Sequence, residues 1–254
     1  MDKSLAHIAS TFSYISRYGN AARIEVVFDE DPGSSESLSK IAELRQVASS
    51  HIGNNVEAVL VGGNSAIQYD TKMASDRDIR VIAPIVLAII FVVLVVLVKA
   101  LVAPLYLLGS VLLSFLGSLG ISVLFFTYIL GHDGIGSGVP IFMFIFLVAL
   151  GVDYNIYIIS RVQEESGKLG IKDGTIAAVS STGGVITSAG IILAGTFASL
   201  TTLPLRELFQ LGFVVAFGVL LDTFFVRGVM VPAFVMLFNK WNWWPSKSVF
   251  SQAE

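Results

Sequence analysis

The feature that most constrains this chain is a series of long apolar runs after residue 80. The first run reads VIAPIVLAIIFVVLVVLV over residues 81–98 and contains no charged side chain. A helix needs about 17–25 such residues to cross the hydrocarbon core of a bilayer. Five segments have this length and character. We therefore predict membrane-spanning helices over residues 81–98, 104–130, 139–160, 182–203 and 208–231.

The second of these segments also allows another interpretation. A break near Gly117 and Gly120 would divide residues 104–130 into two short helices. Neither half would be long enough to span a bilayer. We therefore predict a single span, and an α-helical polytopic membrane protein with about five transmembrane helices.

Composition agrees with this class and excludes several kinds of partner. The chain is 54% hydrophobic and 14% charged, whereas a soluble domain is about a quarter charged. A net charge of −3 without a basic cluster argues against binding of nucleic acid. There is no cysteine, and three scattered histidines lack the spacing of metal ligands. We predict neither a metal site nor a cofactor.

Residues 1–80 carry most of the charge and are predicted to form a separate region. Residues 23–28 (RIEVVF) and 57–63 (EAVLVGG) have the composition of strands, and an amphipathic helix is expected between them. Residues 64–80 are expected to form a helix that leads into the membrane. We predict a small partial α/β segment over residues 1–80. A transmembrane helical domain over residues 81–240 and a tail over residues 241–254 complete the predicted organisation.

The distribution of basic residues predicts the orientation in the membrane. They are concentrated in the loops after the first and third spans and in the tail, at Lys99, Arg161, Lys168, Lys172, Lys240 and Lys247. Because cytoplasmic loops carry an excess of Lys and Arg, these parts are expected inside. The N-terminal segment is then extracytoplasmic and the C-terminus cytoplasmic. Three tryptophans in 241–244 are expected in an aromatic belt at the cytoplasmic interface.

Two acidic residues lie deep within the predicted spans. Asp153 and Asp222 each follow the start of their inward-running helix by 14 residues, which places each roughly 21 Å below the outer surface. Thr187 and Ser188 reach a similar depth in the fourth span. Ionisable residues at such depth usually face a bundle interior and mark a proton or ion route.

Asp153 is the strongest candidate for a proton carrier. A carboxyl group removed from water favours its protonated form, which suits a group that takes up and releases protons. Tyr154 points about 100° away around the helix, so it is expected to act as a relay partner toward a neighbouring helix. Asn155 adds a third polar side chain.

Purely structural roles are the alternative for these polar residues. Either aspartate could be a neutral packing partner. We expect Arg227, five residues after Asp222, to be a structural residue that snorkels toward the cytoplasmic interface and helps to neutralise the region. In the fourth span, Gly190 belongs to a row of small residues that favours close helix packing. Asp222, Thr187, Ser188 and Asn155 are therefore predicted to support either the relay or the packing.

Four stretches together resemble a known transporter family. They read ALGVDYNIYIISRVQEE, STGGVITSAGIILAGTFASLTTLPL, GFVVAFGVLLDTFFVRGVMVPAF and the closing WWP. They resemble the MMPL branch of the resistance-nodulation-division (RND) superfamily, proton-driven bacterial exporters of lipids and other hydrophobic compounds. VGGNSAIQYD, with the apolar run that soon follows, resembles the junction where the family's porter domain re-enters the membrane. The likeness covers about residues 20–245.

The resemblance implies roles and partners. Asp153 and Tyr154 match the family's proton-relaying Asp-Tyr pair, Thr187 and Ser188 match nearby hydroxyl positions, and Asp222 matches an acidic position in the last helix. The chain resembles a C-terminal half fragment of such a transporter in the bacterial cell membrane. Its expected partners are membrane lipids, protons, a lipid or hydrophobic substrate, and an N-terminal half or a further copy of the chain.

The predicted function is therefore part of an exporter driven by the proton-motive force, and not an enzyme. One alternative is a non-transporting remnant or scaffold of a truncated transporter. Another is an intramembrane aspartyl protease, whose two carboxylates share one proton. The motifs oppose the protease, since such enzymes place Tyr before one Asp and Gly before the other. Here Tyr154 follows Asp153, and Leu221 precedes Asp222.

Overall fold

The computed structural model describes residues 14–16, 18–29, 34–51, 53, 56–132 and 134–246. The chain divides into two compact units, Met1–Met73 and Ala74–Glu254. The helix α2 (Asn64–Val98) begins in the first unit and continues into the second.

The first unit contains little regular structure besides its helices. Strands β1 (Tyr14–Ile15) and β2 (Ala22–Arg23) pair in an antiparallel ladder, and α1 covers Ser35–Ser50. The Arg45 guanidinium donates to both carboxylate oxygens of Asp70, at 2.5 and 2.9 Å. This pair links α1 to the start of α2.

Two strand predictions for this unit are wrong. Residues 24–28 and 57–63 have no strand structure. A strand is stable only when a neighbouring strand pairs with its N–H and C=O groups. Among the described residues, the two-residue pairing of β1 with β2 is the whole sheet. The β-prone composition of these stretches therefore has no partner to pair with here.

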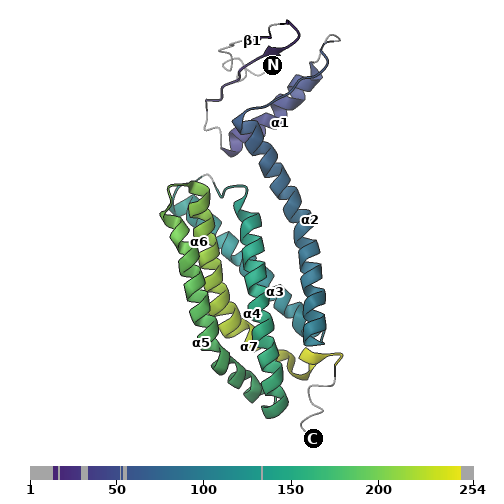
Figure 1. Cartoon of the computed structure of the whole chain (residues 1–254), viewed down its shortest axis with the longest axis vertical. Helices are drawn as coiled ribbons and strands as arrows, with labels where there is room; N and C mark the ends of the chain where they lie inside the picture. The colour runs from purple at the N-terminus through teal and green to yellow at the C-terminus, as the bar shows by residue number, and fades with distance from the viewer. Residues whose placement is uncertain are drawn as a thin grey trace. The chain divides into compact units, whose positions relative to one another are not determined.

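The second unit is a bundle of long helices (Figure 1). In chain order they are α2, α3 (Val102–Leu124) with η1 (Phe125–Ile129), α4 (Val139–Leu169), α5 (Ile171–Ala198) with η2 (Ser199–Thr202), and α6 (Arg206–Leu221) with η3 (Asp222–Met230), α7 (Val231–Phe238) and η4 (Asn239–Trp243). In the part of the chain that the structure describes, five helical segments are long and apolar enough to cross a membrane. The predicted helical polytopic membrane protein is thereby confirmed. α3 passes Gly117 and Gly120 without a break.

Several helices extend beyond the apolar runs that predicted them. α2 begins at Asn64, although its apolar run begins at residue 81. α4 continues to Leu169, and its polar last turns are stabilised by ion pairs of Arg161 with Glu164 (2.6 Å) and of Lys168 with Glu164 (2.8 Å). Ion pairs spaced three and four residues apart stabilise a helix that is exposed to water. Hydropathy therefore marks the span and not the helix ends.

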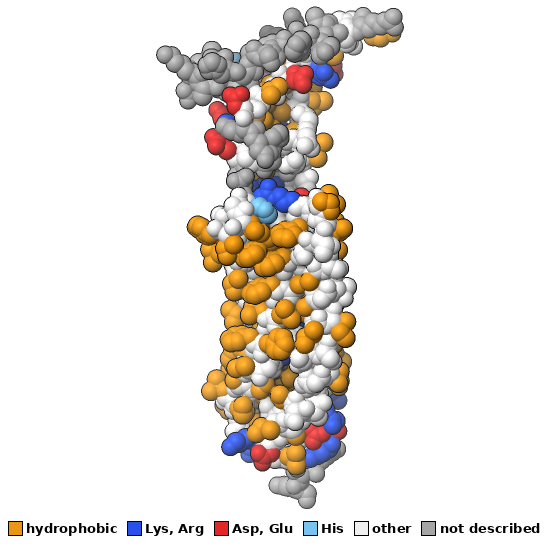
Figure 2. All heavy atoms as spheres, turned by 90° about the vertical axis from the view of Figure 1, so that its left-hand side faces the viewer, with side chains coloured by type: hydrophobic (Ala, Val, Ile, Leu, Met, Phe, Trp, Pro, Cys, Tyr) orange, Lys and Arg blue, Asp and Glu red, His pale blue; other side chains and the backbone are white. Residues whose placement is uncertain are grey.

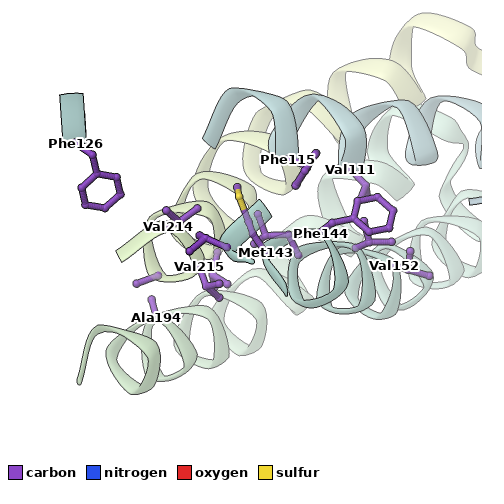
Figure 3. Close-up of a cluster of buried hydrophobic side chains, with 14 of the residues drawn as sticks. Val111, Phe115, Phe126, Met143, Phe144, Val152, Ala194, Val214 and Val215 are labelled. Atoms are coloured by element: carbon purple, nitrogen blue, oxygen red, sulfur yellow. The ribbon is translucent and has the colours of Figure 1, made fainter. Parts of the chain in front are cut away.

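Buried side chains from α3, α4, α5 and α6 fill the centre of the bundle. Figure 3 shows one cluster, in which Phe115 of α3 meets Phe144 of α4 edge to face at 5.4 Å. The outer surface is also apolar. Figure 2 shows hydrophobic side chains along the helices, with charged side chains gathered at the end where α4 passes into α5. An apolar exterior over an apolar core is typical of a bundle that lies in lipid.

The tryptophans near the C-terminus divide between surface and core. Trp241 and Trp244 are exposed, as an interfacial belt requires, but Trp243 is fully buried. The backbone N–H of Leu101 donates to the carbonyl of Trp244 at 2.8 Å. This bond holds the segment after α7 against the connection between α2 and α3, so Trp243 is a core residue.

Candidate functional site

A buried ion pair lies in the last span, where the helix changes its winding. Over η3 (Asp222–Met230) the backbone adopts π-helical bonding. Residues five apart point about 140° apart in an α-helix, whereas i→i+5 bonding brings them toward the same side. Arg227 Nη2 accordingly donates to Asp222 Oδ2, and each residue is only 4% exposed. Arg227 does not snorkel to the interface as predicted, because its partner lies inside the bundle.

Arg227 also connects this ion pair to Tyr154 on α4. Its guanidinium carbon lies 4.2 Å from the centroid of the Tyr154 ring. Nη2 also approaches the carbonyl of Leu150, one turn earlier on α4, at 3.4 Å. A cation over an aromatic face is worth about 2 kcal/mol or more when it is desolvated. The structure therefore brings Tyr154 and Asp222 to one cluster through an arginine that the sequence analysis had assigned elsewhere.

The approach of α5 to this cluster depends on a glycine. A Cβ atom on Gly190 would touch the hydroxyl of Thr223 and lie 2.8 Å from its methyl group. Both residues are buried. Gly190 therefore lets α5 pack directly against η3, which is the close-packing role predicted for the small residues of this span.

Asp153 is placed differently from the interior position that the sequence suggested. Its side chain is exposed on the surface of the second unit, and none of the described residues forms a hydrogen bond or ion pair with its carboxylate. The neighbouring Tyr154 is half-buried against Arg227. Since successive residues of an α-helix point about 100° apart, the two side chains meet different surroundings. The carboxylate faces outward and the phenol ring inward.

The remaining predicted residues do not form one cluster. Asn155 is 1% exposed, and its amide oxygen and nitrogen have no partner among the described residues. Thr187 is half-buried, and Ser188 is exposed with its hydroxyl donating to the Val185 carbonyl at 3.0 Å. Ser188 is thus satisfied within its own helix.

The arrangement does not match a paired-carboxylate or metal centre. Asp222 pairs with a guanidinium and Asp153 is exposed, so the two are not in the shared-proton arrangement of an aspartyl protease. The described residues contain no group of three His, Cys, Asp or Glu side chains that could hold a metal ion.

Two further polar features were missed by the sequence analysis. Gln210, fully buried on α6, donates to the Gly134 carbonyl (3.0 Å) and accepts from the Gly136 N–H (2.8 Å), which fixes the loop between α3 and α4. The other feature is a row of buried serines on α3, at Ser110, Ser114, Ser118 and Ser122. Their regular spacing of four residues is a signal that the sequence does contain.

The comparisons with known proteins agree with this architecture. The chain matches the sequence profile of the MMPL family over residues 5–254. It is 52% identical to the membrane protein ActII-3 of Streptomyces coelicolor in an alignment that covers 73% of this chain. It is 42% identical to the apo-petrobactin exporter of Bacillus anthracis in an alignment that covers 88% of this chain. It is 41% identical to the sulfolipid-1 exporter MmpL8 of Mycobacterium tuberculosis over 91%. These matches cover 26%, 31% and 21% of the relatives' own lengths. The relatives' names describe membrane and export proteins, in agreement with the prediction of a non-enzyme.

Proposed function

The chain belongs to the MMPL family, and from this we propose that it forms the membrane part of one half of an exporter. The exporter is driven by protons and moves lipids or other hydrophobic compounds. Two relatives with 41% and 42% identity are named as exporters of sulfolipid-1 and apo-petrobactin. In this proposal Asp153 carries the proton, and Tyr154 is its relay partner.

The observation that carries the proposal is the exposed carboxylate of Asp153 on a membrane-spanning helix. A charged aspartate at the centre of a spanning helix costs about 2.5–3.5 kcal/mol on insertion scales. Its carboxylate has no partner in the described part of this chain. We propose that another polypeptide covers it with polar groups of its own. That partner is the other half of the transporter or a second copy of the chain.

The buried cluster gives Tyr154 a fixed position at this surface. Asp222 holds Arg227, and the Arg227 guanidinium lies against the Tyr154 ring. A ring held in this way keeps its hydroxyl at one place, where it can accept and donate a proton. Asp222 and Arg227 therefore act as positioning residues in the proposed relay, and Asn155 and Thr187 contribute packing.

Proton binding would change the charge of Asp153 at its contact with the partner. A neutral carboxyl group interacts with polar or charged partner groups less strongly than a carboxylate does. Each protonation then shifts the balance between two arrangements of the halves, which is how a local charge change drives a global movement.

The proposal also includes the orientation of the chain. We propose that the basic loops and the tail lie in the cytoplasm, as the positive-inside rule predicts, so that the N-terminal unit is extracytoplasmic.

The test is an Asp153→Asn change in the complete transporter. Asparagine keeps the shape of the side chain but cannot release a proton. We expect efflux of a fluorescent hydrophobic dye from cells to be lost, with an unchanged amount of folded protein. Asp173→Asn, at an exposed aspartate in the first turn of α5, is the matched control and should export normally. Normal export by Asp153→Asn would contradict the proposal.

A further inference from the structure

The row of serines on α3 has an arrangement that packing alone does not explain. Ser110, Ser114, Ser118 and Ser122 are between 0% and 3% exposed. Because residues four apart lie on one helical face, the four hydroxyls form a line on the side of α3 that faces the bundle. At 1.5 Å per residue this line extends for roughly 18 Å, more than half of the hydrocarbon core.

Three of the four hydroxyls lack a hydrogen-bond partner among the described residues. Ser110 donates to the carbonyl of Leu107 at 2.7 Å, which is the usual solution for a serine in a helix. The hydroxyls of Ser114, Ser118 and Ser122 are buried and unpartnered among the described residues. Nearly all buried polar groups in proteins are bonded to protein or to ordered water. Three successive exceptions in one row indicate bonds to water.

Two neighbouring elements also carry polar atoms that have no partner among the described residues, one past the Ser110 end of the row and one level with its middle. Val111, next to Ser110, packs on Gly151 of α4. A methyl carbon of Val111 lies 3.1 Å from the position that a Cβ atom on Gly151 would occupy. Asn155 lies one turn further along α4, and both its amide atoms lack a partner among the described residues. Since α4 runs antiparallel to α3, as the contact of Phe115 with Phe144 also shows, this turn is level with Leu107, just past the Ser110 end of the row.

The third element is η3. Leu221 lies 3.8 Å from where a Cβ of Gly117 would be, so the following residue, Asp222, is level with the row between Ser114 and Ser118. Oδ1 of Asp222 is buried and has no partner in the described structure. Polar groups that need water are thus found on α3 and, level with its middle serines, on η3.

We propose that the three unpartnered serines of the row, Ser114, Ser118 and Ser122, line a hydrated proton route, to which the already bonded Ser110 does not belong. The route leads from the end of α3 near the loop 131–138 to the Asp222–Arg227 pair. Successive serines are about 6 Å apart along the helix, close to the sum of two hydrogen bonds of about 2.8 Å, so one water fits between each pair. A hydroxyl both donates and accepts, so a chain of serines and waters can pass a proton along its length. The route rests on the proposed function, because it ends at the pair that holds Tyr154, the proposed relay partner of Asp153.

Hydration can be measured directly because the chain has no cysteine. A single Ser118→Cys change places a thiol of nearly the same size in the row, and Val111→Cys is the control on an apolar, buried position of the same helix. We expect a charged methanethiosulfonate reagent to label Ser118→Cys faster by about tenfold or more, since only a hydrated thiol ionises and reacts readily. Equal rates would mean that the row is dry and would overturn the proposal.

Proton conduction needs a second measurement on the complete transporter in membrane vesicles. Replacing Ser114, Ser118 and Ser122 together by alanine removes the hydroxyls but keeps the side chains small. We expect proton uptake to slow by about tenfold, the factor that corresponds to one hydrogen bond of ordinary strength. Ser110→Ala, which removes the hydroxyl that is already bonded, should leave uptake unchanged. Normal uptake by the triple variant would show that the serines serve packing alone.

The labelling also separates this route from the proposed relay. In an Asp153→Asn background, fast labelling of Ser118→Cys is expected to persist, because the route is independent of the carrier. Slow labelling in the otherwise unchanged protein overturns the route and leaves the relay standing. Normal export by Asp153→Asn overturns the relay, whereas the labelling rates still report on the route.

Discussion

Replacing Arg227 by methionine would remove the guanidinium that holds the proposed site together. Methionine has a similar length and fills most of the space. The change leaves the Asp222 carboxylate buried without its cation, and breaking a buried pair in this way costs about 3–5 kcal/mol. The loss of the contact with the Tyr154 ring, 4.2 Å from the guanidinium carbon, adds to this cost. We therefore expect a destabilisation at the upper end of that range.

A double-mutant cycle tests whether the cost arises from the pair. Asp222→Asn alone leaves a buried guanidinium and should cost a similar amount. The Asp222→Asn/Arg227→Met double variant has no buried charge, and such replacements are often neutral or stabilising. The double variant should therefore be much more stable than the sum of the two single changes implies.

The assay is thermal or denaturant unfolding of the purified protein in detergent. For a chain of this size, about 1 kcal/mol lowers the Tm by roughly 2–4 °C, so each single variant should unfold roughly 6–20 °C earlier. If the two single effects are close to zero, or if they add without coupling in the double variant, the pair does not stabilise the bundle. That result would refute the positioning role of Asp222 and Arg227.

Three other changes test the cluster of Asp222, Arg227 and Tyr154 and the loop between α3 and α4. Gly190→Val should destabilise the fold by about 1–3 kcal/mol or more, because its side chain would collide with Thr223. The unfolding midpoint measures this, and Gly195→Val, at a glycine with open space around it, should have little effect. Gln210→Leu leaves the Gly134 carbonyl and the Gly136 N–H without partners, which should lower the stability by about 1–3 kcal/mol. Faster hydrogen exchange of the amides in the α3–α4 loop would reveal this loss. Tyr154→Phe keeps the ring over the guanidinium, so stability should change by less than about 0.5 kcal/mol while export is lost; retained export would exclude the hydroxyl from the relay.

The spans were predictable because lipid imposes a simple rule on composition. Uninterrupted apolar runs of sufficient length reveal helices that cross a bilayer, and five such segments are present. The helix ends were not predictable in the same way. The polar turns at the start of α2, from Asn64 onward, carry no hydropathy signal, although a helix leading into the membrane was predicted there and is confirmed. The last turns of α4 depend on ion pairs such as Arg161 with Glu164.

The candidate site was only partly readable from the sequence. The depth of an aspartate follows from counting residues, but the side to which it points depends on the neighbouring helices. Asp153 and Asp222 have equivalent positions in their runs, yet one is exposed and the other buried. Arg227 was expected to help neutralise the region of Asp222, but its direct pairing inside the bundle was not predicted, because α-helical geometry separates the two residues whereas the π-helical stretch aligns them.

The serine row was also only partly readable from the sequence, which gives its spacing but not the direction in which it points. Its spacing of four residues can be read directly from the sequence. However, the rest of α3 is apolar both toward the bundle and toward the outside, so no hydrophobic stripe marks the face that is buried. The contact of Val111 with Gly151 and that of Leu221 with Gly117 establish which side of α3 faces the bundle.

Proton flux through the complete transporter is the most direct test of the central claim, that Asp153 carries protons. A pH-sensitive dye inside vesicles would report proton movement when an imposed gradient drives transport. We predict that the wild type and Asp173→Asn dissipate the gradient at equal rates, and that Asp153→Asn shows only the background leak of vesicles without transporter. Wild-type flux through Asp153→Asn would contradict the account.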